Sequence, residues 1–238
     1  MSSRYFWKQR CRQPRAPDRS LRQFFWGDDV PFRVTCFIDG FNLYHAIKDM
    51  NRPELKWIDL RKLMECFTDP HSHAITAVYY FSAYATWLPG PYGRHKQYVA
   101  AIAATGCTPI MGHFKNKHRQ CSHCGFLHKG HEEKESDVHI ATRMVCGAFD
   151  DEYDHAFLLS RDSDLAPPLR LIRGRFPLKK IKIIAPPGRL HSKELGGIAT
   201  HRASIKTEHL ERCLLPQTVA DASGMTMATR PRDYDPPV

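Results

Sequence analysis

A short apolar run that ends in an aspartate is the feature that most constrains this chain. Residues 34–38 read Val-Thr-Cys-Phe-Ile, and Asp39 and Gly40 follow directly. A continuous apolar run that stops at a breaker is typical of a buried strand. Open α/β sheets bind their ligands at the carboxyl ends of the strands. The pattern therefore predicts that Asp39 lies at a ligand-binding edge, where Asn42 can cap the next helix or line the site.

Two further acidic stretches follow the same logic. The apolar run 155–160 leads into Asp162 and Asp164, and a helix predicted over 134–149 carries Asp137 in its first turn. The first turn of a helix is its positive end, which favours a carboxylate. We expect the four aspartates to meet in one pocket, although a single aspartate of this kind is more often a turn or cap residue.

The order of predicted elements indicates the fold class. Strands are predicted over 33–39, 74–83, 107–111, 155–160 and 181–185, and helices over 59–67, 93–105, 134–149 and 165–173. Strands that alternate with helices imply an α/β fold with a mainly parallel central sheet and right-handed crossovers. Shorter elements are expected at 192–199, 203–206 and 208–213.

The chain divides into three segments by composition. Residues 1–31 form a basic, aromatic-rich extension that is predicted to be flexible, with a nucleic-acid grip and a mitochondrial presequence as open alternatives. Residues 32–216 form the α/β domain. Residues 217–238 are polar and rich in proline, which predicts a disordered tail.

Charge and composition narrow the choice of partner. The formal net charge is +10, from 35 basic and 25 acidic residues, which favours a polyanion such as RNA over a generic soluble role. No apolar window approaches the roughly 18 residues of a membrane span, and no cleavable leader is visible. We therefore expect no membrane partner and a reducing, cytoplasmic location, with a homodimer left open.

Clustered carboxylates repel one another, so their convergence implies a cation. Hard oxygen ligands suit Mg²⁺ or Mn²⁺, and such ions activate water and stabilise a phosphoryl transition state. Asp39, Asp137, Asp162 and Asp164 are the predicted metal ligands. Four neighbours are candidates for hydrogen bonds or ion pairs to a phosphate, namely Ser160, Arg161, Ser163 and Lys134. Walker-type nucleotide binding is excluded because no Gly-Lys-Thr or Gly-Lys-Ser occurs.

These residues resemble a known family. Residues 37–44 (Phe-Ile-Asp-Gly-Phe-Asn-Leu-Tyr), 132–138 (Glu-Glu-Lys-Glu-Ser-Asp-Val) and 159–164 (Leu-Ser-Arg-Asp-Ser-Asp) resemble three motifs of NYN domains, the LabA-like branch of the PIN-like nucleases. The resemblance covers about residues 33–216. It implies a Rossmann-like, three-layer PIN fold and a metal-dependent ribonuclease site at Asp39, Asn42, Asp137, Asp162 and Asp164. Arg161 departs from the family pattern, which more often has glycine there.

A polar excursion over 113–131 interrupts the α/β pattern and is predicted to be a Cys/His hairpin insertion. Cys121 and Cys124 have the spacing of half a zinc knuckle, and His128 and His131 are the nearest candidates to complete four ligands. A structural Zn²⁺ is one interpretation. A hairpin with two free thiols, and a site shared between two chains, are the others.

The sequence thus predicts a metal-dependent endoribonuclease that hydrolyses RNA phosphodiester bonds. Two other functions stay open on the same residues. One is a non-catalytic RNA-binding or scaffold module, favoured by the basic N-terminal segment and Arg161. The other is a nucleotide phosphohydrolase that acts on mononucleotides rather than polymers.

Overall fold

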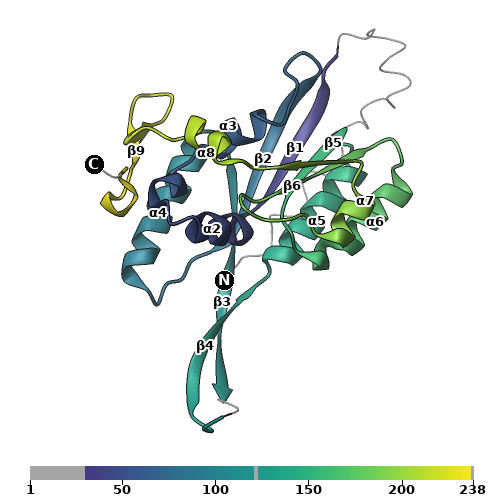
Figure 1. Cartoon of the computed structure of the whole chain (residues 1–238). Helices are drawn as coiled ribbons and strands as arrows, with labels where there is room; N and C mark the ends of the chain where they lie inside the picture. The colour runs from purple at the N-terminus through teal and green to yellow at the C-terminus, as the bar shows by residue number, and fades with distance from the viewer. Residues whose placement is uncertain (1–29, 121–122, 237–238) are drawn as a thin grey trace, which may run out of the picture.

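A seven-stranded sheet forms the centre of the molecule in the computed structural model, which describes residues 30–120 and 123–236 (Figure 1). The strand order is β4-β3-β2-β1-β5-β6-β7, and all neighbours are parallel except β3 and β4. The strands are β1 (Phe32–Asp39), β2 (His73–Ala83), β3 (Thr108–Gln120), β4 (Leu127–Lys134), β5 (His155–Leu159), β6 (Lys180–Ala185) and β7 (His201–Ser204). The predicted α/β class with a mainly parallel sheet is therefore confirmed. Nearly all of the N-terminal extension predicted over 1–31 lies outside the described residues.

Helices cover both faces of this sheet. One face carries α2 (Gly40–Asp49), α3 (Leu60–Glu65), α4 (Pro89–Ala104) and α8 (Thr207–Arg212), and the other carries α5 (Ser136–Phe149), α6 (Ala166–Arg175) and α7 (Lys193–Ile198). Strand β1 explains this arrangement, because Cys36 and Ile38 pack into the first layer while Phe37 packs into the second. Burial on both sides is why the strand reads as a continuous apolar run. Among the described helices, none is long and apolar enough to cross a membrane.

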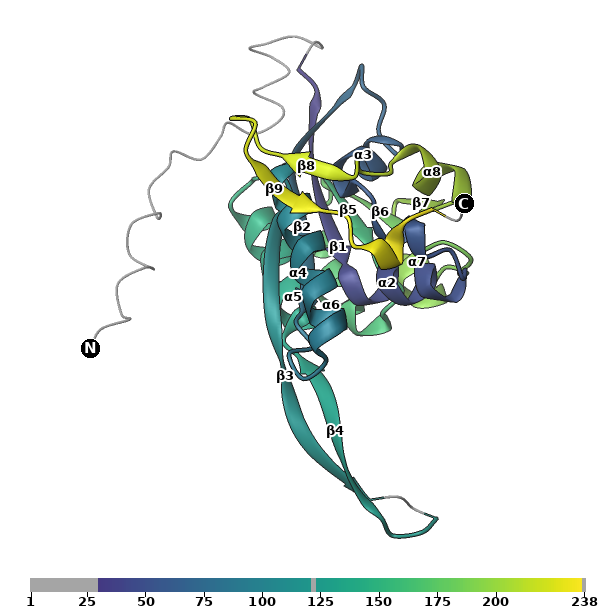
Figure 2. The same cartoon turned by 90° about the vertical axis from the view of Figure 1, so that its left-hand side faces the viewer.

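Strands β3 and β4 form a hairpin that extends away from the body of the molecule (Figures 1 and 2). Residues 108–112 pair with β2, and residues from His113 onward pair antiparallel with β4, as far as Gln120 opposite Leu127. The sequence predicts this strand only to residue 111. The error has a physical reason: an isolated two-stranded ribbon has no buried face, so its residues show no apolar alternation.

The end of the chain packs on the domain. The sequence predicts a disordered tail over 217–238, and this is wrong for residues 217–236. Strands β8 (Thr218–Ala220) and β9 (Thr226–Thr229) form a second sheet, and the 3-10 helix η3 (Arg232–Tyr234) follows. Val219, Ala228 and Tyr234 are buried in a cluster with Trp57 of the domain. These three apolar side chains are sufficient to hold the segment on the domain, because they pack against the apolar surface of Trp57.

Candidate functional site

The carboxyl edge of the sheet brings two acidic segments together. Strands β1 and β5 are parallel neighbours, with Ile38 opposite Leu159. Asp39 and Ser160 follow these residues and therefore lie side by side at the same edge. Asp162 and Asp164 come directly after β5, where Asp162 precedes the short 3-10 helix η2 (Ser163–Leu165). The convergence of these two segments follows from strand order alone.

Asp39 is buried and held by three hydrogen bonds. Its carboxylate accepts from the backbone N–H of Asn42 at 3.0 Å, from Asn42 Nδ2 at 2.5 Å and from Ser160 Oγ at 2.8 Å. The first of these bonds also caps helix α2. Burial raises the pKa of Asp39, and the charge of Asp162 adds to this, while the three hydrogen bonds act in the opposite direction. The carboxylate is therefore fixed in one orientation but is costly to ionise.

Gly40 permits the turn from β1 into α2. A Cβ atom at this position would lie 2.7 Å from the carbonyl oxygen of Phe81 and 2.7 Å from the ring of Tyr80. Real Cβ atoms do not approach backbone oxygen so closely, so only glycine fits at the start of α2 against β2. The residue after the strand-terminal aspartate is therefore fixed by packing.

Ser160 connects the two acidic segments. Its side chain is fully buried, donates to Asp39 and accepts from the backbone N–H of Asp162 at 3.0 Å. Asp162 in turn accepts from the backbone N–H of Asp164 at 2.9 Å. The sequence predicts that Ser160 binds substrate, but the structure places its hydroxyl inside the protein with both partners taken. The Ser160 hydroxyl group therefore orients the Asp39 carboxylate and the backbone of Asp162.

Asp137 completes the cluster from the other face of the sheet. It is half-buried in the first turn of α5, which begins after Glu135 in the left-handed region at a φ of 80°. Burial and the negative charges of Asp162, Asp39, Glu133 and Asp164 together raise the pKa of Asp137 to about 6. These carboxylates therefore share one electrostatic environment.

Glu133 also belongs to this cluster, although the sequence motifs did not predict a role for it. It precedes α5, and its Oε1 accepts from the backbone N–H of Ser136 at 3.1 Å. Its charge also acts on Asp137. The signal was available in the sequence, because Glu133 belongs to the same acidic motif as Asp137.

The donor set fits a hard divalent cation. Within the described residues, no Lys or Arg forms an ion pair with any of the four aspartates, so their mutual repulsion has no internal compensation. The same residues contain no group of three His, Cys, Asp or Glu side chains already arranged around one point. A cation here would therefore need water ligands besides the carboxylates, as Mg²⁺ usually has.

The three other residues predicted to contact a phosphate are Arg161, Ser163 and Lys134, and unlike Ser160 they are not buried. The Arg161 side chain is exposed, with its Nε donating to the carbonyl of Leu190 at 2.7 Å. Its backbone N–H donates to Asn42 Oδ1 at 3.3 Å. Ser163 is exposed at the start of η2. The Lys134 ammonium pairs with Glu132 at 3.2 Å.

The structure separates two members of the predicted zinc site. Cys124 is exposed near the tip of the hairpin, whereas His131 lies four residues into β4 and stacks on Trp87, with ring centroids 3.6 Å apart. Four strand residues span roughly 13 Å, too far for one tetrahedral ion. Cys121 and the side chain of His128 lie outside the described residues, so a zinc at the tip stays a prediction without His131.

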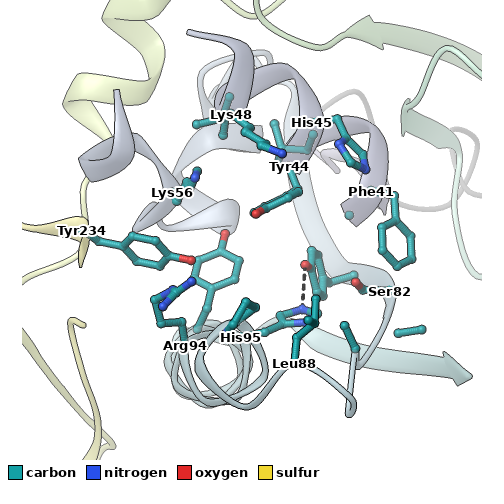
Figure 3. A pocket seen from close by; sticks show the side chains of 18 of the residues that line it. Phe41, Tyr44, His45, Lys48, Lys56, Ser82, Leu88, Arg94, His95 and Tyr234 are labelled. Carbon is teal, nitrogen blue, oxygen red and sulfur yellow. Dashed lines mark hydrogen bonds between the residues drawn. The ribbon is translucent and has the colours of Figure 1, made fainter. Parts of the chain in front are cut away.

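The sequence gives no indication of a cavity that opens beside the acidic edge. Its volume is about 420 Å³, and it lies between α2 and α4 (Figure 3). Phe41, Tyr44, Lys56, Arg94, His95 and Tyr234 are among the residues that line it. They come from four separate elements, which is why no local motif reveals them.

Comparison with known proteins identifies the family. Residues 33–201 match the model of the NYN domain. This chain belongs to the NYN domain family. The family places it in the PIN-like nuclease superfamily, so the resemblance of the three acidic motifs is confirmed.

Two proteins similar to this NYN domain chain are an enzyme with a named activity and a protein of unknown function. One is 23% identical and covers 81% of this chain and 73% of its own length: the 6-hydroxy-3-succinoylpyridine 3-monooxygenase HspA of Pseudomonas putida. The other is a crystal structure of a protein of unknown function from Vibrio parahaemolyticus, at 19% identity and a TM-score of 0.56. It covers 79% of this NYN domain chain and 98% of its own, and it shows the shared fold.

Proposed function

We propose that this NYN domain is a metal-dependent endoribonuclease that hydrolyses RNA at the carboxyl edge of its sheet. The main support is the convergence of Asp39, Asp137, Asp162 and Asp164, where burial and the neighbouring negative charges together raise the pKa of Asp137 to about 6. Groups with perturbed pKa values that have no internal counter-charge are typical of functional sites. The basic charge of the whole chain favours RNA as the polymer that approaches them.

Each residue has a distinct part in this proposal. Asp137, Asp162 and Asp164 are accessible and, with Asp39, would hold Mg²⁺ or Mn²⁺. Asn42 and Ser160 fix the Asp39 carboxylate. A bound divalent cation supplies an acidified water molecule and stabilises the charge of the phosphate in the transition state.

The phosphate contacts are proposed to come from the exposed side chains around this edge. Arg161 uses one guanidinium N–H for Leu190, which leaves the others for a phosphate oxygen. Ser163 and Lys134 are accessible for the same purpose. Cytoplasmic location is part of the proposal, since the described cysteines are free thiols, as in a reducing compartment.

RNA cleavage with Mg²⁺, with Mn²⁺ and with chelator tests the proposal directly. We expect Asp39→Asn and Asp137→Asn to lower the rate by about a hundredfold or more, because each removes a charge that stabilises the reacting groups. Asp150→Asn is the matched control, because Asp150 is exposed at the far end of α5. Cleavage at the wild-type rate by Asp39→Asn would contradict the proposal. So would the absence of cleavage with every metal and RNA tried.

The same assays separate the two alternatives that the sequence leaves open. Salt-sensitive RNA binding without cleavage, unchanged in Asp39→Asn, identifies a non-catalytic RNA-binding module. Turnover of mononucleotides in preference to RNA identifies a phosphohydrolase.

One observation favours a second enzymatic candidate, the oxidation of a small aromatic acid. The HspA relative is named for a pyridine that carries a succinoyl acid group, and the cavity of this chain combines aromatic rings with cationic side chains. Oxygen uptake in the presence of a hydroxypyridine acid and a reduced nicotinamide cofactor tests it. The absence of uptake from a preparation that cleaves RNA would remove this candidate.

A further inference from the structure

The cavity between α2 and α4 adjoins the carboxylates of the proposed centre. Asp39 lies opposite Phe81 in the pairing of β1 with β2, so Ser82 and Ala83 extend one and two residues farther toward the carboxyl edge. Both line the cavity, as does Phe41, which follows Asp39 by two residues. The cavity therefore lies next to the strand end that carries Asp39.

One part of the cavity carries an excess of positive charge. Lys48, Lys56 and Arg94 line it together. Arg94 pairs with Asp233 at 2.7 Å, whereas Lys48 and Lys56 have no ion pair with any acid of the described residues. Burial lowers the pKa of Lys56, and the charges of Lys48 and Arg94 lower it further. An anion bound here would relieve this repulsion.

Aromatic rings surround the same space. The ammonium of Lys56 lies 5.2 Å from the ring centroid of Tyr44 and 5.8 Å from that of Tyr234. The Tyr44 side chain is partly exposed, and its ring can accept a further partner. Figure 3 shows Lys56, Arg94 and Tyr234 on one side of the cavity and Phe41 and Ser82 on the opposite side. The cavity thus has one side where cationic and aromatic side chains lie together, and an opposite side that is uncharged.

His95 belongs to the uncharged part. Burial lowers its pKa to about 4, so the imidazole is neutral near pH 7. Its Nε2 lies 3.2 Å from the hydroxyl of Tyr80, a contact drawn in Figure 3. A neutral imidazole among tyrosines suits an uncharged ring with hydrogen-bonding edges better than a second anion.

We propose that this cavity binds one nucleotide, with its base among the aromatic side chains and its phosphate at Lys48, Lys56 and Arg94. The inference rests on the proposed ribonuclease function, since it assigns a place to the residue next to the bond that is cut. Base stacking on aromatic rings beside a cationic groove is a general mode of single-strand recognition. The volume of about 420 Å³ lies in the range of small-ligand sites, roughly 300–1,000 Å³.

The test separates the base from the phosphate and the cavity from the catalytic centre. Adenosine 5′-monophosphate and adenosine are titrated calorimetrically into the Asp39→Asn protein in chelator, where no cleavage interferes. The monophosphate should bind about ten- to a hundredfold more tightly, the range expected for hydrogen bonds to a charged group. Lys56→Gln should erase this preference, and Tyr44→Leu should weaken both ligands.

Lys62→Gln is the matched control, because Lys62 is an exposed lysine of α3 that does not line the cavity. Thermal melts of all variants identify any that fail to fold, and Tyr44→Leu changes a partly exposed side chain if Lys56→Gln is unstable. A five-residue RNA that displaces the monophosphate identifies an RNA strand as the source of the nucleotide. A five-residue RNA that does not displace it identifies a free nucleotide.

Failure of the inference is distinguishable from failure of the proposed function. RNA cleavage by the wild type without nucleotide binding overturns the inference alone, as does equal binding by Lys56→Gln and Lys62→Gln. Nucleotide binding without cleavage under any metal removes the ribonuclease and leaves the cavity as a nucleotide site. Binding of a hydroxypyridine acid with no binding of nucleotides also overturns the inference.

Discussion

Asp39 and Asp137 belong to one acidic cluster but differ in what holds them. Asp39 accepts hydrogen bonds from Asn42 and from the buried Ser160, so its orientation depends on these two neighbours. No side chain of the described residues donates a hydrogen bond to Asp137, and burial together with the charges of the other acids raises its pKa. Substitutions near Asp39 therefore test how its carboxylate is oriented, and substitution of Asp137 tests the charge repulsion within the cluster.

The charge of Asp137 leads to a prediction about pH. Its folded pKa of about 6 exceeds the ordinary value of 3.8, so the folded state binds more protons than the unfolded state between these values. Stability should therefore fall as the pH rises through about 4 to 6. Without metal at about pH 7.5, Asp137→Asn should melt about 2–4 °C above the wild type, which corresponds to roughly 1 kcal/mol.

This difference should vanish near pH 4, where the wild-type carboxyl group is protonated as well. Mn²⁺ should raise the melting temperature of the wild type and have less effect on Asp137→Asn. Differential scanning fluorimetry at both pH values measures these shifts. A wild type that is more stable than Asp137→Asn in chelator at about pH 7.5 would contradict the repulsion argument.

The orientation of Asp39 leads to a second prediction. Ser160→Ala leaves Asp39 short of one donor and the backbone N–H of Asp162 without its acceptor. We expect a loss of about 1–3 kcal/mol in unfolding free energy, the cost of an unsatisfied buried group. RNA cleavage should fall as well, since both acids lose a constraint. Thr226→Ala, which removes an exposed hydroxyl group of β9, is the control, and urea unfolding with a cleavage assay gives both readouts.

At the element scale, the turn between β1 and α2 determines whether the centre forms. Gly40→Ala places a methyl group 2.7 Å from the Phe81 carbonyl, which forces the helix and strand apart. We expect a loss of about 3 kcal/mol or more, comparable with severe overpacking. Gly93→Ala in α4 meets nothing within 4 Å and should stabilise the fold by up to about 1 kcal/mol. Opposite signs in chemical denaturation would confirm the difference, and a neutral Gly40→Ala would contradict it.

The elements that could be read from the sequence are those that bury a face. Leu60, Leu63 and Met64 of α3, or Val34 to Ile38 of β1, carry a periodic signal because the core selects it. The β3–β4 hairpin has no such signal beyond Gly112. The hairpin of β8 and β9 has a different signal, the turn from Asp221 to Gly224. In this turn the Asp221 carboxylate accepts hydrogen bonds from the backbone N–H groups of Ser223 and Met225, and Gly224 has a φ of 84°. The low apolar content of its surroundings concealed that turn.

The sequence predicted those residues of the candidate site that lie at the ends of strands. Asp39 ends β1, and Asp162 and Asp164 come soon after β5, so the strand order alone brings them to the same edge of the sheet. The burial of Ser160 and the nearness of Glu133 depend on side-chain directions that no pattern of the sequence fixes. The cavity draws on η1 (Pro53–Lys56), α2, α4 and η3, which only the finished packing brings together.

At the scale of the whole molecule, the C-terminal segment is part of the folded unit. Ending the chain at Pro216 removes Val219, Ala228 and Tyr234 from their cluster and exposes Trp57. Each buried apolar side chain contributes roughly 1.5–3 kcal/mol, so we expect a clear loss of thermal stability. Removing only residues 237 and 238 is the control. A shortened chain that melts at the wild-type temperature would show that this packing contributes nothing.

Tyr234 has a consequence for how this family diversifies. It lines the cavity from outside residues 33–201, the range shared with other NYN domains. Tyr234 and the carboxylates therefore stand on separate stretches of polypeptide, which mutation and gene rearrangement alter independently. An exchange of the final segment alone would give an unchanged set of acids a new neighbouring specificity.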